Sequence, residues 1–342
     1  MLRLPPIRIE APDTLQDAAQ LLSNGNTRLV AGGTDLWPNM KRRHQQADTV
    51  VSLMSIPELD VIDNGKTNTR IGATATLADV IRDDEVRRRF PAFAKAVASI
   101  SSPPLRNMGT IGGNLCVDTR CTYYNQTEEW RRSIDYCLKE EGQICWVATK
   151  SPRCWAHTAS DSAPILCALD ARVTLVSSTG ERELPLKDMY VDDGIDYLAK
   201  RADEILTELT IPAASDDSQC RSAFWKLRRR GSIDFSTMSV AVAVWTDDSD
   251  VVTRATMYLG AVGAAPMPVA EVDAVLVGNK ISKDRIAEIA HVAHQIARPM
   301  DNTDFTASWR GKMTEQYVTA ALREIAGMPP LHMQPRHRLR VI

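Results

Sequence analysis

Four cysteines between residues 121 and 154 form the densest group of potential ligands in the chain. They are Cys121, Cys137, Cys145 and Cys154, within the segment RCTYYNQTEEWRRSIDYCLKEEGQICWVATKSPRCWAH of residues 120–157. Cysteine often packs in a protein core as a small apolar residue. The charged runs of this segment are not typical of core sequence, so this role is disfavoured for its four cysteines. In a reducing compartment, clustered thiols are more often ligands or redox groups than disulfides. We therefore predict that the segment binds a metal or a metal cluster.

The spacing of these cysteines favours an iron–sulfur cluster over zinc. Fifteen, seven and eight residues separate successive cysteines, whereas structural zinc sites usually contain close C-x2–4-C pairs. Iron–sulfur clusters also take four thiolates, and the bound cluster can organise the loop that wraps around it. Cys116 and His157 stay open as alternative ligands. Cys167 and Cys220 are expected to pack as apolar residues.

Two glycine-rich turns offer a second kind of chemistry. They are LVAGGTD at residues 29–35 and GTIGGN at residues 109–114. Consecutive glycines allow backbone N–H groups to converge on an anion without hindrance from a Cβ atom. Neither turn has the G-x-G-x-x-G or G-K-[ST] pattern of the common nucleotide-binding loops, and a single Gly-Gly pair usually marks a tight turn. Two such turns in one domain favour a pyrophosphate cradle.

Short strands and helices alternate around these turns and predict an α/β organisation for the first part of the chain. A helix follows a cap at Asp13 or Thr14, and another opens at Thr76. A helix is expected over residues 161–169, then a hairpin near residues 178–180 and a strand that ends at Pro212. These elements must bring the two glycine turns together if the turns share a ligand.

The second part of the chain predicts an α+β arrangement. The strands RSAFWKLRR, MSVAVAVWT and RATMYLGAVGAAPM alternate in a way that favours an antiparallel sheet with one solvated face. Helices are expected over 282–297 and 306–326, and a polar stretch at 214–219 marks a boundary. We expect a first domain over 1–215, with the cysteine-rich insertion at 116–157, a second domain over 216–326 and an extended tail over 327–342.

Composition narrows the function classes. The 342 residues carry a formal net charge of −2 without a long basic or acidic run, which disfavours a dedicated nucleic-acid or membrane-surface binder. Neither a membrane-length apolar stretch nor a secretory signal is recognised, so a cytoplasmic protein is expected. His291 and His294 lack the acidic partner of a zincin motif, and no hydrolytic or acid–base site is recognised, so catalytic residues are not assigned.

Taken together, these segments resemble a known family. LVAGGTDL, RNMGTIGGNLC and SDSAPILCALDARVTLVS, followed by FWKLRRRGSIDFS, YLGAVGAAPM and DFTASWRGKMTEQYVTAALREI, are similar to the flavin-binding subunit of the xanthine oxidase and carbon monoxide dehydrogenase family. The resemblance extends in order over nearly the whole chain. It implies a two-part α/β FAD-binding domain followed by a C-terminal domain with an antiparallel sheet and helices.

The resemblance also implies roles for individual residues. One side of the FAD pyrophosphate would be wrapped by Leu29, Val30, Ala31, Gly32, Gly33, Thr34 and Asp35, and the other side and the ribityl chain held by Thr110, Gly113 and Asn114. Asp161 would accept hydrogen bonds from cofactor hydroxyls. Ile100 and Leu206 would flank the isoalloxazine, with core packing as their alternative role. Lys226 would lie near the polar edge of the ring, with a surface position on a strand as its alternative.

The cysteine segment departs from the usual pattern of the family. About forty residues separate the GGNL turn from the SD-x-x-P helix, where most members have a short link. The insertion resembles one found in an aryl-CoA reductase branch of the family, where it holds an additional [4Fe-4S] cluster, and this implies Cys121, Cys137, Cys145 and Cys154 as ligands. The implied partners are a large molybdopterin subunit, a small [2Fe-2S] subunit and a ferredoxin-like electron donor. The alternatives are the flavin subunit of a conventional molybdenum hydroxylase with a structural metal insertion, and a zinc-stapled interaction protein.

Overall fold

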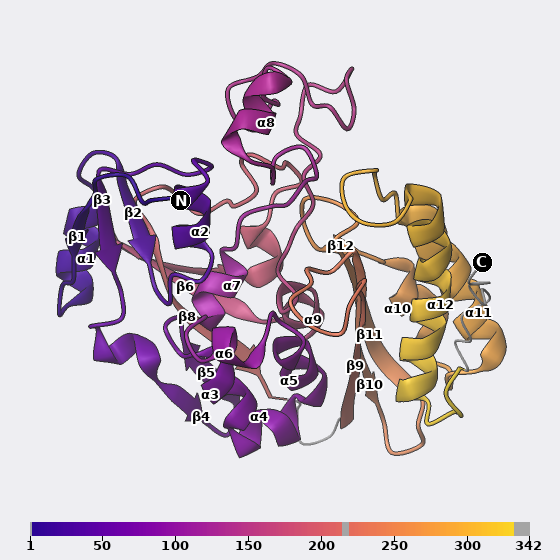
Figure 1. Cartoon of the computed structure of the whole chain (residues 1–342). Helices are drawn as coiled ribbons and strands as arrows, with labels where there is room; N and C mark the ends of the chain where they lie inside the picture. The colour runs from indigo at the N-terminus through magenta and orange to yellow at the C-terminus, as the bar shows by residue number, and fades with distance from the viewer. Residues whose placement is uncertain (1, 214–218, 332–342) are drawn as a thin grey trace.

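Three sheets organise the part of the chain that the computed structural model describes, residues 2–213 and 219–331 (Figure 1). The first sheet is parallel, in the order β1 (Arg8–Glu10), β3 (Thr49–Ser52), β2 (Thr27–Val30). Helix α1 (Leu15–Leu22) packs on it and buries Ala18, Ala19 and Leu22. Of the two residues expected to cap this helix, Asp13 and Thr14, the cap is Thr14, whose hydroxyl accepts a hydrogen bond from the Asp17 amide. Helix α2 (Leu36–Lys41) follows β2.

The second sheet is antiparallel and completes the first domain. Its order is β4 (Ile62–Asn64), β5 (Asn68–Gly72), β8 (Ile205–Pro212), β6 (Arg172–Ser177), β7 (Gly180–Pro185). The helices associated with this sheet are α3 (Leu77–Arg82), α4 (Asp84–Arg89), α5 (Pro91–Ala98), α6 (Pro103–Arg106), α7 (Ile111–Leu115) and α9 (Ala163–Ala168). Short 3-10 turns lie at Pro57–Asp60 and Leu186–Met189. The predicted opening of α3 at Thr76 and the hairpin between β6 and β7 are confirmed.

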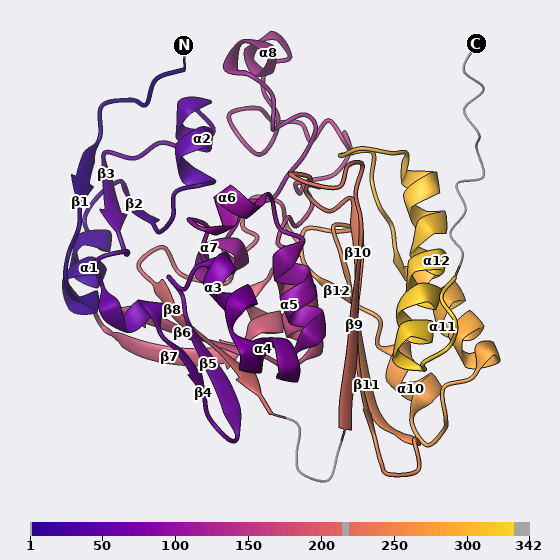
Figure 2. The ribbon, with the colours of Figure 1, turned by 60° about the horizontal axis from the view of Figure 1, so that its bottom comes forward.

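The third sheet forms the C-terminal domain, and one expectation about it is wrong. Its order is β12 (Met267–Pro268), β11 (Val252–Gly260), β10 (Met238–Thr246), β9 (Gln219–Leu227), all antiparallel. Helices α10 (Glu271–Leu276), α11 (Lys283–Ile296) and α12 (Ala307–Ile325) lie on one side (Figure 2). The other face is not solvated, because α5 and α9 of the first domain pack against β9 and β10. Strand β10 is therefore buried along nearly its whole length.

The two domains share a hydrophobic core across this contact. Phe224, Ala241 and Ala243 of the third sheet belong to the same buried cluster as Phe93 of α5 and Leu166 of α9. A second cluster lies between the other face of the sheet and helices α10 to α12. Apolar packing thus fixes the orientation of the two domains. Residues from both domains therefore keep fixed relative positions at any site that they share.

The cysteine-rich insertion stands above this body as an irregular arm (Figure 1). Its one helix in the described ranges is α8 (Glu128–Ser133), which Thr127 caps by accepting a hydrogen bond from the Trp130 amide. The sequence-based interpretation did not include this helix. The expected boundary at 214–219 lies mostly outside the described residues, as does most of the expected tail. Among the described helices, none has both the length and the apolar character needed to cross a membrane.

Candidate flavin pocket and cysteine site

The first glycine turn links β2 to α2 and is held by a close approach of two backbone segments. Gly33 has a φ of +70°, which favours glycine. A Cβ atom at Gly32 would lie 1.5 Å from the Met108 carbonyl oxygen, so only glycine fits there. Asp35 accepts a hydrogen bond from the Asn39 side-chain amide at 2.8 Å and forms an ion pair with the buried Arg120. The turn is thus fixed on both sides before any ligand binds.

The second glycine turn begins α7 and lies beside the first. Thr110 caps this short helix by accepting a hydrogen bond from the Gly113 amide at 3.2 Å. A Cβ at Gly109 would lie 3.3 Å from the Thr34 hydroxyl, so the two turns are in contact. Asn114 accepts hydrogen bonds from Ser160 and Ser162 at 2.9 and 2.6 Å. The two turns therefore lie together, as they must if they share a ligand.

A pocket of about 480 Å³ opens between the two turns. Six of the predicted cofactor residues line it: Leu29, Val30, Ala31, Asp35, Gly113 and Leu206. Gly32, Gly33, Thr34, Thr110 and Asn114 belong to the same two turns without lining the pocket. Cys116, Asp118, Tyr197 and Lys200 also line it, and the sequence-based interpretation did not place them in a cofactor site. Tyr197 and Lys200 come from the long connection before β8, which carries no motif.

Asp161 and Lys226 form a separate buried ion pair between the two domains. Each side chain is 4% exposed, and the Lys226 ammonium lies 2.5 Å from one Asp161 carboxylate oxygen and 3.1 Å from the Ser99 carbonyl oxygen, next to Ile100. The surface alternative for Lys226 is therefore wrong. Burial raises the pKa of Asp161, and the charge of Lys226 opposes this rise.

The second carboxylate oxygen of Asp161 is buried without a hydrogen-bond partner among the described residues. Leaving such an acceptor unsatisfied costs about 1–3 kcal/mol. A ligand hydroxyl would offset that cost, because a hydroxyl is a donor and can reach a carboxylate oxygen. In the second turn the Gly112 and Gly113 amides already donate to Ala73 and Thr110. The residues present therefore fit a group that carries both a diphosphate and hydroxyls, as FAD does, through the glycine amides of the first turn and the free acceptor at Asp161.

All four cysteines of the insertion are buried and line one small pocket, together with Tyr124, Lys139 and Trp146. Cys121, Cys137 and Cys154 also share a local apolar cluster. Cys116 lines the flavin pocket instead, and the buried His157 places its Nδ1 2.8 Å from the Thr158 carbonyl oxygen. Cys167 is buried in α9 and Cys220 is half-buried on β9, as expected.

The four insertion cysteines do not form a preformed metal site in this structure. Within residues 2–213 and 219–331, no group of three or more histidine, cysteine or acidic side chains is placed to hold a metal ion. A metal site rarely exists fully formed before the metal displaces the thiol protons. The Cys154 thiol lowers the pKa of Cys145 to about 5 through a hydrogen bond, whereas burial raises that of Cys121 to about 11. The donor set itself, four buried thiols in one pocket, fits an iron–sulfur cluster.

Buried polar contacts fix the insertion to both domains. Arg131, 1% exposed, donates to the Arg42 carbonyl at 2.7 Å and lies 3.1 Å from the Glu140 carboxylate. His44 lies 2.8 Å from the Tyr124 carbonyl oxygen, and burial lowers the pKa of this imidazole to about 4. On the other side, the Asn302 amide donates to the Trp155 carbonyl at 2.6 Å. The cysteine pocket therefore has a defined position relative to the flavin pocket.

The fold and the glycine turns define a flavin-binding oxidoreductase subunit, and comparison with known proteins supports this class. Residues 5–214 match the FAD binding domain in molybdopterin dehydrogenase, and residues 222–325 match the CO dehydrogenase flavoprotein C-terminal domain. The chain belongs to the family of FAD-binding medium subunits of the xanthine oxidase and carbon monoxide dehydrogenase type. The predicted fold class is confirmed.

Individual relatives align over most of their length. The nicotinate dehydrogenase FAD-subunit of Eubacterium barkeri is 29% identical over 85% of this chain and 86% of its own. The carbon monoxide dehydrogenase medium chain of Hydrogenophaga pseudoflava is 24% identical over 93% and 96%. A solved structure of carbon monoxide dehydrogenase from the same organism has a TM-score of 0.77, with 23% identity over 95% and 99% of the two chains, which supports the fold.

Proposed function

We propose that this chain is the FAD- and [4Fe-4S]-carrying electron-transfer subunit of a 4-hydroxybenzoyl-CoA reductase. Such an enzyme adds two electrons and two protons to the substrate and releases benzoyl-CoA and water. The observation that carries the proposal is that Cys121, Cys137, Cys145 and Cys154 line one buried pocket in an insertion of a flavin-subunit fold. Binding of FAD alone requires no thiolate ligands, whereas a [4Fe-4S] cluster takes four.

The flavin would be held by the residues of the two glycine turns and the buried ion pair. The turn at residues 29–35 and Thr110, Gly113 and Asn114 would bind the diphosphate and ribityl chain, and the free oxygen of Asp161 would accept from a hydroxyl. Ile100 and Leu206 would pack against the isoalloxazine, with Lys226 near its polar edge. When bound, FAD links one-electron and two-electron exchange.

The insertion is proposed as the entry point for electrons. The arm that carries the cysteines stands at the surface, with α8 at its tip (Figure 1). A cluster below that surface would be within reach of a ferredoxin-like donor, while Trp146 and Tyr124 limit water around the sulfur atoms. The chain would pass these electrons towards the molybdenum.

The proposed assembly is a heterotrimer in the cytoplasm, with a large molybdopterin subunit and a small [2Fe-2S] subunit. This division of labour is supported by the names of the relatives, which include a nicotine 6-hydroxylase medium subunit and a carbon monoxide dehydrogenase medium chain. Because the substrate is aromatic and the chemistry reductive, the proposed context is the anaerobic degradation of aromatic compounds.

A second candidate is the flavin subunit of a conventional molybdenum hydroxylase, with the insertion in a structural role. It is favoured by the names of several relatives, among them a nicotinate dehydrogenase, a nicotine 6-hydroxylase and a carbon monoxide dehydrogenase. In that case electrons would leave the molybdenum through the flavin, and the insertion would have no part in their path.

The two candidates differ in the reaction of the assembled complex. We expect the complex of this chain with its two partner subunits, supplied with reduced ferredoxin and 4-hydroxybenzoyl-CoA without oxygen, to form benzoyl-CoA. The product is measured by chromatography, with a complex lacking ferredoxin as the control. If the complex forms no benzoyl-CoA but oxidises an N-heterocycle or an aldehyde with an artificial acceptor, the hydroxylase candidate is correct.

A further inference from the structure

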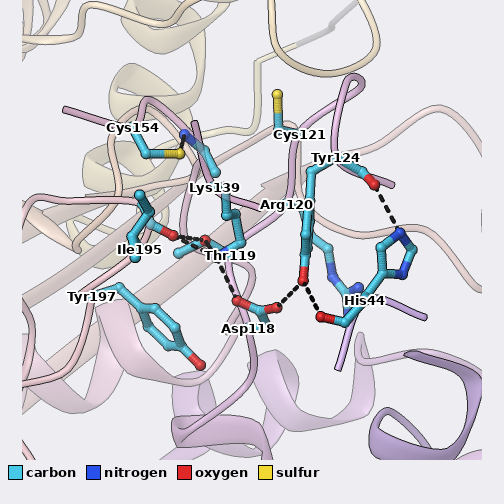
Figure 3. Close-up of polar contacts among 12 residues, drawn as sticks. His44, Asp118, Thr119, Arg120, Cys121, Tyr124, Lys139, Cys154, Ile195 and Tyr197 are labelled. Atoms are coloured by element: carbon cyan, nitrogen blue, oxygen red, sulfur yellow. Dashed lines mark hydrogen bonds and ion pairs between the residues drawn. The ribbon is translucent and has the colours of Figure 1, made fainter. Parts of the chain in front are cut away.

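Lys139 lies in the wall between the cysteine pocket and the flavin pocket. It lines the cysteine pocket, two positions after Cys137, whereas its ion-pair partner Asp118 lines the flavin pocket. The ammonium is 2.8 Å from the Asp118 carboxylate, and both side chains are only 6% exposed. Figure 3 shows Lys139 between Cys154 and Asp118. One buried ion pair thus borders both candidate cofactor sites.

The ammonium is held in place from several sides. It donates to the Thr119 hydroxyl at 2.9 Å and to the Gly194 carbonyl at 2.5 Å. It also lies over the rings of Tyr124 and Tyr197, at 5.0 and 5.3 Å from their centres. A buried lysine with three hydrogen-bond acceptors and two aromatic faces has little freedom to turn away. Its charge therefore has a fixed position relative to both pockets.

The Lys139–Asp118 ion pair has a fixed direction between the two pockets. Asp118 accepts a further hydrogen bond from the Tyr124 hydroxyl at 3.2 Å. Among the neighbouring charged groups, Glu140 pairs with Arg131, and Arg120 pairs with Asp35. Lys200, which also lines the flavin pocket, donates to the Arg201 and Glu204 carbonyl oxygens. The positive end of the Lys139–Asp118 pair lies on the side of the cysteines and the negative end on the side of the glycine turns.

We propose that the buried positive charge of Lys139 raises the reduction potential of the cluster held by the four cysteines. This inference rests on the proposed function. Reduction adds one negative charge to a cluster with four thiolate ligands, and a buried positive charge stabilises that added charge with little screening by water. Net charge and hydrogen bonds around the sulfurs are among the factors that set cluster potentials. Asp118, at the other end of the pair, acts in the opposite direction.

The test is a redox titration of the assembled complex, in which electron paramagnetic resonance monitors the reduction of the insertion cluster. The signal of this cluster is the one that a Cys137→Ser complex lacks. Lys139→Gln is expected to reduce the equilibrium constant for one-electron reduction at least tenfold, which is ~59 mV. Asp118→Asn is expected to shift the potential in the opposite direction. Lys150→Gln, an exposed lysine of the same insertion, is the control and should leave the potential unchanged because solvent screens its charge.

The outcomes separate this inference from the proposed function. If the wild-type complex has no iron in the insertion, both fail. If iron is present and neither Lys139→Gln nor Asp118→Asn moves the potential, or both move it in the same direction, only the role of Lys139 is overturned. Should Lys139→Gln fail to retain the cluster, the upward shift in Asp118→Asn decides the question.

Discussion

Replacing Cys137 with serine is expected to remove the insertion cluster while leaving FAD bound. The Cys137 thiol is buried in the pocket that the other three cysteines line, and a serine hydroxyl is a poor substitute for a thiolate ligand of iron. The complex should lose about four irons, the content of one cubane cluster. Ferredoxin-driven turnover should fall by more than about tenfold, because ligand loss is more severe than loss of a supporting residue. Iron analysis, flavin release and the turnover assay measure these changes.

The matched control for this variant is Cys220→Ser. Cys220 is half-buried on β9, far from the insertion in sequence and outside the cysteine pocket. The iron content of the Cys220→Ser complex should therefore match that of the wild type. Cys116→Ser should also retain iron, because Cys116 lines the flavin pocket. Normal iron and normal turnover in Cys137→Ser would exclude the insertion as the entry point for electrons.

Replacing Gly32 with alanine is expected to weaken FAD binding at least tenfold, about 1.4 kcal/mol. The added Cβ would lie 1.5 Å from the Met108 carbonyl oxygen, far inside any allowed contact. The first glycine turn and the segment before the second would therefore have to move apart. Backbone amides that converge on one anion lose that geometry when their turns separate. Flavin content after gel filtration, and the dissociation constant of added FAD measured by fluorescence, report the effect.

Gly231→Ala is the control for this variant. A Cβ at Gly231 has no neighbour within 4 Å among the described residues, so FAD content should not change. Circular dichroism and thermal unfolding of both variants establish that the chain is folded. A folded Gly32→Ala protein that binds FAD with wild-type affinity would show that the glycine turns do not form the diphosphate site.

The sequence was informative wherever local chemistry determines structure. The cap at Thr76, the cap at Thr14 (one of the two residues expected there) and the first Gly-Gly turn are short-range features that are found where they were predicted. The second Gly-Gly pair, Gly112 and Gly113, instead lies inside the short helix α7. The grouping of the four insertion cysteines follows from their nearness in the chain. The contact between the two glycine turns was expected only on the condition that they share a ligand, since more than seventy residues separate them.

The remaining features depend on contacts between distant segments. The sheet of the C-terminal domain was expected to have a solvated face, and the packing of α5 and α9 on β10 could not be read from the β10 sequence alone. Similarly, Asp161 meets Lys226 and Asp118 meets Lys139 only after the chain has folded. Such pairings carry no periodic or motif signal, because a lysine on a strand or loop has the same sequence appearance whether buried or exposed.

The most direct test of the account is the absorbance spectrum and iron content of this chain, released from its partner subunits and kept free of oxygen. We predict flavin bands together with about four irons per chain, the count of one cubane held by four thiolates. Flavin without iron would contradict the cluster assignment and leave only the family membership. A colourless chain that contains zinc would contradict the redox role of the cysteine insertion altogether.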